Sequence, residues 1–166
     1  MKGQYTNYNH RTGKIGKARA DDVSIHFKQA VEIASTIRGM PVKRAKQFLV
    51  NVMHQKEAVP FRRYRYGIGR NAQGKAWKWA QSGFPKKASK YILDLIRTAE
   101  NSARQQSVNV KKCTIDHIKV NEARVRSRRT YRAHGRINHF DKHPCHIEII
   151  LKEREIAVPK AAEKKE

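Results

Sequence analysis

The chain has 166 residues, with 37 lysines and arginines against 14 acidic residues, so its formal net charge is +23 at pH 7. This length suits one domain with an ordinary core and not clearly two. No stretch approaches the ~20 apolar residues of a membrane span, and the N-terminus lacks the apolar segment of a signal peptide. The composition therefore predicts a single basic domain with no membrane association.

The positive charge is concentrated in three segments. Residues 1–20, 58–93 and 123–140 contain no acidic residue and hold 5, 9 and 6 basic residues, which is +20 of the net +23. Solvated surfaces usually mix charges of both signs. The segregation therefore favours a polyanionic ligand over ordinary surface charge.

The predicted elements begin near residue 20. Residues 1–20 are polar, basic and without hydrophobic periodicity, which predicts an extended arm or a disordered tail. Val23 and Ile25 alternate with polar residues and indicate a short strand. A helix then runs from His26 to a stop at Gly39, and its apolar face consists of Phe27, Ala30, Val31, Ala34 and Ile37.

Two further helices are predicted, each opened by a proline that suits the first helical position. The helix that starts at Pro41 has an apolar face made of Val42, Ala45, Phe48, Leu49 and Val52. The helix that starts at Pro85 is the longest and runs to about Gln106. Its apolar stripe consists of Ala88, Tyr91, Ile92, Leu95, Ala99 and Ala103.

Residues 56–84, between these two helices, contain six aromatic residues and four glycines. A loop of this length in a small domain is functional or disordered, and its aromatic residues argue against disorder. Arginines interleaved with aromatic rings are typical of RNA binding, in which each stacked base contributes ~1–3 kcal/mol. Trp77 and Trp79 could stack on bases or pack on the body. Gly67 and Gly69 lack the context of a dinucleotide fingerprint and are interpreted as turn residues.

The C-terminal half predicts two strands with the arginine-rich segment between them. The first strand covers Thr114–Val120, and the second carries an apolar face of Cys145, Ile147, Ile149 and Leu151. Residues 123–140 hold six arginines, no lysine and no carboxylate. We interpret residues 121–144 as an extended hairpin with its midpoint near Arg132–Gly135, where Gly135 supplies a positive φ.

The fold class is therefore α+β: three helices packed on a small antiparallel sheet of about three strands, with a long protruding basic β-hairpin. The domain is expected at residues 21–155, after a basic arm at 1–20 and before a disordered tail at 156–166. Arginine suits bidentate phosphate contacts and stacking on bases. The predicted ligand is nucleic acid, and RNA in particular.

Catalytic and metal chemistry are disfavoured. A nuclease needs clustered carboxylates to hold metal ions, but only Asp21 and Asp22 are adjacent, and they are expected to precede or cap the first helix. Cys113 and Cys145 have no CxxC spacing and are interpreted as reduced thiols, although histidines near both leave a metal site open. We predict no enzymatic activity and no cofactor. The alternative function is an architectural protein that binds RNA or DNA.

Five segments carry a resemblance to a known family. They are VPFRRY (59–64), GFPKKA (83–88), AENSA (99–103), RRTYRAHGRIN (128–138) and PCHIEIIL (144–151), in that order. They resemble the tunnel-lining protein of the large ribosomal subunit, numbered twenty-two in bacteria and seventeen in eukaryotes. The similarity covers about residues 18–155, and the 56–84 loop resembles the eukaryotic form. His139 stands where members of the family often have proline.

The resemblance implies an α+β body docked on rRNA near the exit of the peptide tunnel. The hairpin tip would approach the nascent polypeptide through Tyr131, Arg132, Ala133, His134, Gly135 and Arg136. The expected rRNA-binding residues are Arg62, Arg63, Arg65, Arg70, Lys75, Lys78, Lys86, Lys87, Arg124, Arg126, Arg128 and Arg129. Further partners would be neighbouring large-subunit proteins and factors docking at the tunnel exit, in cytoplasmic ribosomes that, in a eukaryote, are assembled in the nucleolus.

Overall fold

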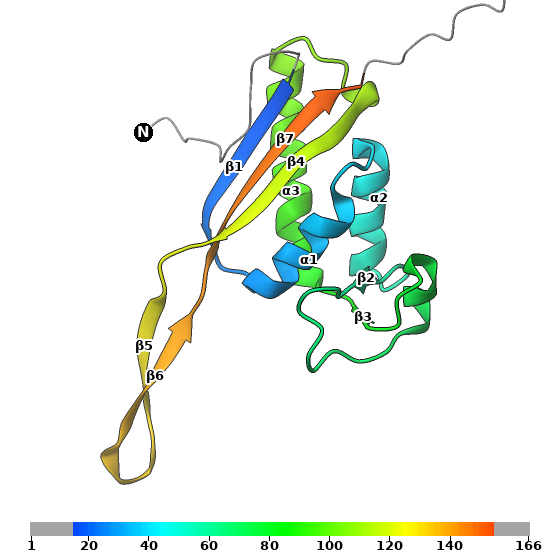
Figure 1. Cartoon of the computed structure of the whole chain (residues 1–166). Coiled ribbons are helices and arrows are strands. Elements are labelled where there is room, and N and C mark those ends of the chain that lie inside the picture. Colours follow the sequence, from blue (N-terminus) through cyan, green and yellow to red (C-terminus); the bar gives the residue numbers. More distant parts are fainter. Residues whose placement is uncertain (1–14, 155–166) are drawn as a thin grey trace, which may run out of the picture.

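The computed structural model describes residues 15–154. They form a three-stranded antiparallel sheet, three helices on one of its faces, a separate two-stranded hairpin and a folded loop (Figure 1). The predicted α+β class, with three helices and a small antiparallel sheet, is confirmed. The tail expected at 156–166 and the first fourteen residues of the expected arm lie outside the described residues.

The three predicted helices are confirmed as α1 (Phe27–Ile37), α2 (Val42–Met53) and α3 (Lys86–Gln105). Pro41 and Pro85 are the N-cap residues of α2 and α3, one position earlier than expected. All five residues of the expected α2 face are at most 2% exposed. Tyr91 on α3 is the exception to its predicted stripe, because it lies at the edge of the buried face and is 44% exposed.

The sheet has the order β1–β7–β4, and β7 is the central strand. These strands span Ile15–Val23 (β1), Cys113–Glu122 (β4) and Cys145–Glu153 (β7). The predicted apolar face of β7 is confirmed, with all four residues at most 1% exposed. A register shift between Ile115 and His117 adds one residue to β4, so that Ile115 and Ile118 are both buried.

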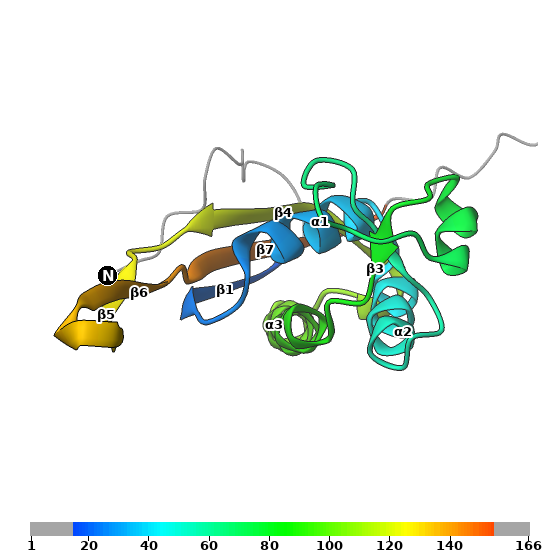
Figure 2. The same ribbon diagram turned by 90° about the horizontal axis from the view of Figure 1, so that it is seen from below.

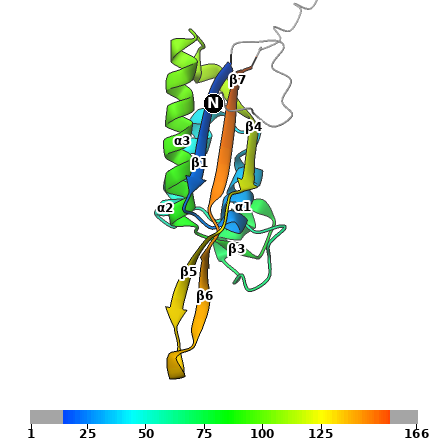
Figure 3. The ribbon, with the colours of Figure 1, turned by 90° about the vertical axis from the view of Figure 1, so that its left-hand side faces the viewer.

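The helices cover one face of this sheet. β1 lies against α3, and β4 lies against α1. The end-on view of Figure 2 and the side view of Figure 3 show the strands as one layer, with α1 and α2 behind it in Figure 3 and α3 beside β1. One continuous core joins the side chains of all three helices to the inner face of the sheet.

Strand β1 corrects two expectations. Residues 15–20 belong to this strand and not to a polar arm, and of the short strand expected at Val23 and Ile25 only Val23 is in a strand, as the last residue of β1. Because several residues of this strand are small, its sequence shows no clear hydrophobic alternation. A Cβ on Gly16 would lie 2.6 Å from the Cβ of Ala103 on α3, so β1 fits against that helix only with a glycine there. Backbone pairing with β7 defines the strand.

The remaining elements lie outside the main sheet. The loop between α2 and α3 contains β2 (Val59–Pro60), β3 (Ser82–Gly83) and a 3₁₀ helix at Ala72–Trp77. The hairpin consists of β5 (Arg126–Tyr131) and β6 (Ile137–Lys142), which, within residues 15–154, pair only with each other. Short 3₁₀ turns occur at Val110–Lys112 and Ala133–Gly135. Between residues 15 and 154, no helix has the length and apolar character needed to cross a bilayer.

Candidate nucleic-acid interface

The hairpin projects away from the body, and its turn lies where the sequence predicts it. The ladder runs from Arg126 opposite Lys142 to Tyr131 opposite Ile137, which leaves residues 132–136 as the turn. Gly135 has the predicted positive φ, +71°. His134 also has a left-handed backbone, with φ of +60°, which the sequence did not indicate.

The pairing sorts the hairpin side chains onto two faces, because directly paired residues share a face and successive residues alternate. Arg126 and Arg128 share one face with Phe140 and Lys142, and this basic face has no acidic residue. On the opposite face, Arg129 is accompanied by Asp141 and His139. The same face ends in Tyr131 and Ile137 beside the turn, which are 73% and 47% exposed. The charge of the shaft therefore lies mainly on one side.

The hairpin arginines have almost no acidic partners among the residues that the structure describes. All six are exposed. Arg126 lies 3.7 Å from Asp22, and between residues 15 and 154 no ion pair involves the other five. An exposed pair at such a distance contributes little to stability. The arginines are thus available to an external polyanion.

The joint between hairpin and body is irregular. The last pair of the main sheet is Glu122 with Cys145, and the first pair of the hairpin is Arg126 with Lys142. Three residues therefore lie on one side of the joint and two on the other. The N–H of Ala123 donates to the carbonyl of Pro144 at 3.0 Å, which is the backbone link across this gap. The extra residue acts as a bulge, so the hairpin bends away from the sheet (Figure 1).

Of the two tryptophans of the 56–84 loop, Trp77 packs against the core of the body, whereas Trp79 is hydrogen-bonded within the loop. The indole N–H of Trp77 donates to the carbonyl of Ala58 at 3.0 Å, and that of Trp79 donates to the carbonyl of Phe61 at 2.8 Å. The Trp77 ring meets Phe48 edge-on, with ring centroids 5.6 Å apart. Gly67, with φ of +72°, has the predicted turn conformation.

A buried carboxylate that the sequence analysis missed anchors the start of the arginine-rich part of this loop. Glu32 on α1 is 2% exposed. Its carboxylate accepts hydrogen bonds from the backbone N–H groups of Arg62, Arg63 and Tyr64 at 3.1, 2.9 and 2.7 Å. The backbone is thereby fixed while the arginine side chains stay exposed. The sequence did contain one signal for this role, because Glu32 is an acidic residue among the small and apolar residues of α1.

The remaining predicted RNA-binding residues also lie on the surface. Every one of Arg62, Arg63, Arg65, Arg70, Lys75, Lys78, Lys86 and Lys87 is exposed. Tyr66, which follows Arg65 in the chain, is 90% exposed. Lys86 and Lys87 open α3, where the helix dipole disfavours positive charge. The hairpin, the loop and this helix start all lie toward one end of the body (Figure 1).

Of the two positions expected for Asp21 and Asp22, the structure shows that they precede α1 and do not cap it. Its N-cap residue is His26, and the two aspartates lie in a register shift of β1. Asp21 pairs with Arg19 at 2.8 Å and with His146 at 3.0 Å. Strand pairing prevails over helix capping here, because β1 extends to Val23.

The two cysteines are free and buried. Burial raises the pKa of Cys145 to about 11. Burial, and then the negative charges of Glu153 and Glu100, also raise the pKa of Cys113. Thiolates, the form that binds metals, are therefore disfavoured at both positions. Over the described part of the chain, no three His, Cys, Asp or Glu residues come together as a metal site.

In residues 15–154, a small α+β body displays arginines without ion-pair partners on a hairpin and on an anchored loop, an arrangement typical of proteins that bind polyanions. The sequence profile described as ribosomal protein L22p/L17e matches residues 18–152. The chain therefore belongs to the ribosomal protein L22p/L17e family.

Curated relatives agree with this assignment. The chain is 47% identical over 161 residues to the large ribosomal subunit protein uL22 of Phlebotomus papatasi, with 97% of this chain and 87% of that protein covered. It is 46% identical over 160 residues to the protein of the same name from Bombyx mori, covering 96% and 86%. The protein of that name from Drosophila melanogaster is 44% identical over 161 residues, covering 97% and 87%. The predicted resemblance, including its eukaryotic character, is confirmed.

Proposed function

We propose that this chain is a structural constituent of the large ribosomal subunit, where it binds rRNA and lines the nascent-peptide tunnel with its hairpin tip. The observation that carries the proposal is the set of exposed hairpin arginines, five of which have no ion pair within residues 15–154. Membership of the L22p/L17e family supports the ribosomal setting. The proposed role is structural, without a catalytic step.

Two groups of residues are assigned to the two parts of this role, which are rRNA binding and tunnel lining. The rRNA contacts are assigned to the loop, the start of α3 and the shaft: Arg62, Arg63, Arg65, Arg70, Lys75, Lys78, Lys86, Lys87, Arg124, Arg126, Arg128 and Arg129. The nascent polypeptide passes the hairpin tip, whose residues are Tyr131, Arg132, Ala133, His134, Gly135 and Arg136. The tip suits this position because it is narrow and carries side chains that are exposed on all sides.

The proposed setting follows from the same assignment. The partners are large-subunit rRNA, neighbouring ribosomal proteins, the nascent chain and factors that dock at the tunnel exit. The protein would act in cytoplasmic ribosomes and join the subunit in the nucleolus. The folded body, with β1 as its first strand, is the rRNA-docking domain, and the hairpin is its extension.

Co-sedimentation and cross-linking test the proposal. The full-length chain should remain with large subunits through a high-salt sucrose cushion. A photoreactive residue in place of His134 should cross-link to a stalled nascent polypeptide, whereas the same residue at Arg124 should cross-link to rRNA. Release of the chain at moderate salt would refute the ribosomal role. Peptide cross-links from position 124 in place of 134 would refute the tip assignment.

A further inference from the structure

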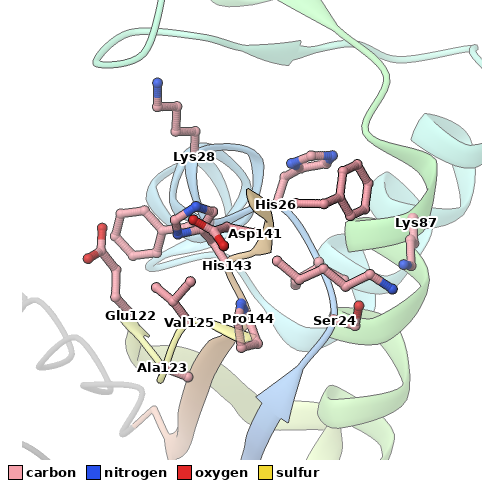
Figure 4. Close-up of a pocket in the computed structure, with 14 residues that line it drawn as sticks. Ser24, His26, Lys28, Lys87, Glu122, Ala123, Val125, Asp141, His143 and Pro144 are labelled. Carbon is pink, nitrogen blue, oxygen red and sulfur yellow. The ribbon is translucent and has the colours of Figure 1, made fainter. Parts of the chain in front are cut away.

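A groove of about 640 Å³ lies where the hairpin joins the body. The residues before and at the start of α1 form one wall, and the joint and the base of β6 form the other. Figure 4 shows Lys28 on α1 and Lys87 on α3 at different sides of this groove. The expected rRNA-binding residues include Lys87 but no other residue of this groove.

The groove contains apolar and aromatic surface that the fold leaves uncovered. Phe140 from β6 is 56% exposed and Val125 from the joint is 45% exposed, and both line it. Phe27, only partly buried, lines the groove from α1. A phenylalanine at an exposed position of a basic hairpin contributes nothing to the core. Its flat face is suited to stacking on a planar ligand.

The charges around this surface indicate which planar ligand fits. Lys28, Lys87 and Lys142 line the groove, and no ion pair involves any of them within residues 15–154. Two acidic residues, Glu122 and Asp141, line it as well, Asp141 from the face of the hairpin opposite to Phe140. Lysines attract phosphates, whereas carboxylates repel them and accept hydrogen bonds from exocyclic amino groups of bases. The combination fits a nucleotide whose base enters the groove while its phosphates stay beside the lysines.

We infer that this groove binds a single unstacked base of RNA, with Phe140 as the stacking surface. The inference rests on the proposed RNA-binding function and adds a defined subsite to it. Sequence-independent contacts to phosphates come from the basic face of the hairpin, which also carries Arg126 and Arg128. Phe140 lies on that same face, so the strand that follows the RNA backbone also presents the ring to an extruded base. A carboxylate in the groove favours adenine, cytosine or guanine over uracil, which has no exocyclic amino group.

The test uses the full-length protein and two RNA duplexes of equal length, one fully paired and one with a single bulged 2-aminopurine. This adenine analogue loses fluorescence when it stacks. Binding should quench the bulged probe. Phe140→Leu, which keeps an apolar residue and the net charge, should weaken binding of the bulged duplex by about fivefold or more. The affinity for the fully paired duplex and its salt dependence should not change.

Tyr91→Leu is the matched control, because Tyr91 is a comparably exposed aromatic residue on α3, outside the groove. It should alter neither affinity, and Phe140→Trp should retain quenching. Equal affinities of wild type and Phe140→Leu for the bulged duplex would overturn the base site while leaving RNA binding intact. Absence of binding to both duplexes would overturn the proposed function itself. In assembled subunits, a photoreactive residue at position 140 should cross-link to rRNA, and cross-links to a protein alone would overturn the inference.

Discussion

Glu32 shows how one buried side chain controls an exposed binding segment. Its carboxylate holds three consecutive N–H groups, so the loop backbone at residues 62–64 cannot move without leaving a buried charge unpaired. The arginines that follow are therefore presented from a rigid support. Less conformational entropy is lost when such a preorganised segment binds its ligand.

Replacing Glu32 by glutamine should loosen this support. The amide of glutamine offers one oxygen, and its NH₂ group would face a backbone donor. We expect a loss of about 1–3 kcal/mol in the free energy of unfolding, measured by urea denaturation. Amide hydrogen exchange at residues 62–64 should also become faster. Unchanged exchange at these three amides would show that the carboxylate does not anchor the loop.

Glu57 provides a comparison, because its ion pair is on the surface. The hydrogen bond from Arg44 lowers the pKa of Glu57, although partial burial opposes this shift. A lowered pKa in the folded state stabilises the protein above the unfolded-state pKa, and the contribution is lost as the pH falls through the folded-state value. The difference in stability between wild type and Glu57→Gln should be under ~1 kcal/mol at pH 7 and should shrink as the pH falls below the unfolded-state pKa of the carboxyl group. A difference that grows on acidification would contradict this assignment.

Residue-level prediction from sequence succeeded where side-chain type alone decides the environment. The apolar faces of α2 and β7 and the exposure of the arginines are examples. It failed for Glu32 and left Trp77 undecided, because both depend on which backbone groups the fold brings near them. A hydrogen bond between residues 30 positions apart leaves no periodic signal in the chain.

Among the elements, the hairpin has the weakest internal support. Its ladder has six residue pairs, but apart from partly buried Thr130 and Asn138 its residues are exposed. A two-stranded hairpin without a packed face is marginally stable in water. The main sheet, in contrast, has one face packed against the hydrophobic core.

We therefore expect a sharp contrast in hydrogen exchange in the free protein. Amides of residues 126–142 should exchange quickly, whereas those of Ile147–Leu151 should stay protected, because they open only with the core. Binding of RNA should slow exchange in the hairpin. Slow exchange at residues 128–136 without RNA would show that the hairpin is ordered on its own.

The predictability of the elements follows the strength of their side-chain patterns. Three helices with clear apolar stripes were located to within one or two residues. Strand β1 was mostly missed because glycine and alanine face α3, and the one-residue excess at the hairpin joint has no signature in the sequence. Both are consequences of packing between distant segments.

At the scale of the whole molecule, the charged segments and the fold are spatially separate. The core is apolar and ordinary, whereas the hairpin, the loop and the start of α3 carry exposed cations toward one end (Figure 1). Such a distribution brings many phosphates into contact at once, so binding should depend strongly on the release of counterions.

Affinity of the free protein for structured RNA should therefore fall steeply with salt. For ~6–10 phosphate contacts, we expect a loss of about 10³-fold or more between 50 and 200 mM salt. Fluorescence anisotropy over a salt series measures the slope. The double variant Arg126→Gln, Arg128→Gln should reduce the slope by about two contacts, whereas Tyr91→Leu should leave it unchanged. A log–log slope shallower than about −2 would exclude extensive phosphate binding.

The uneven joint at the base of the hairpin also restricts how the chain can change in length. Side chains alternate along a strand, so the number of residues between Glu122 and Arg126 determines which way the hairpin faces. Inserting one residue on each side of the joint would preserve every residue pair between β5 and β6. It would nevertheless turn the hairpin by about half a rotation about its long axis. Phe140 and the arginines beside it would then point away from α1. Insertion of a single residue at the joint should be far less tolerated than a substitution. The insertion changes which way the hairpin faces, whereas a substitution changes only one side chain.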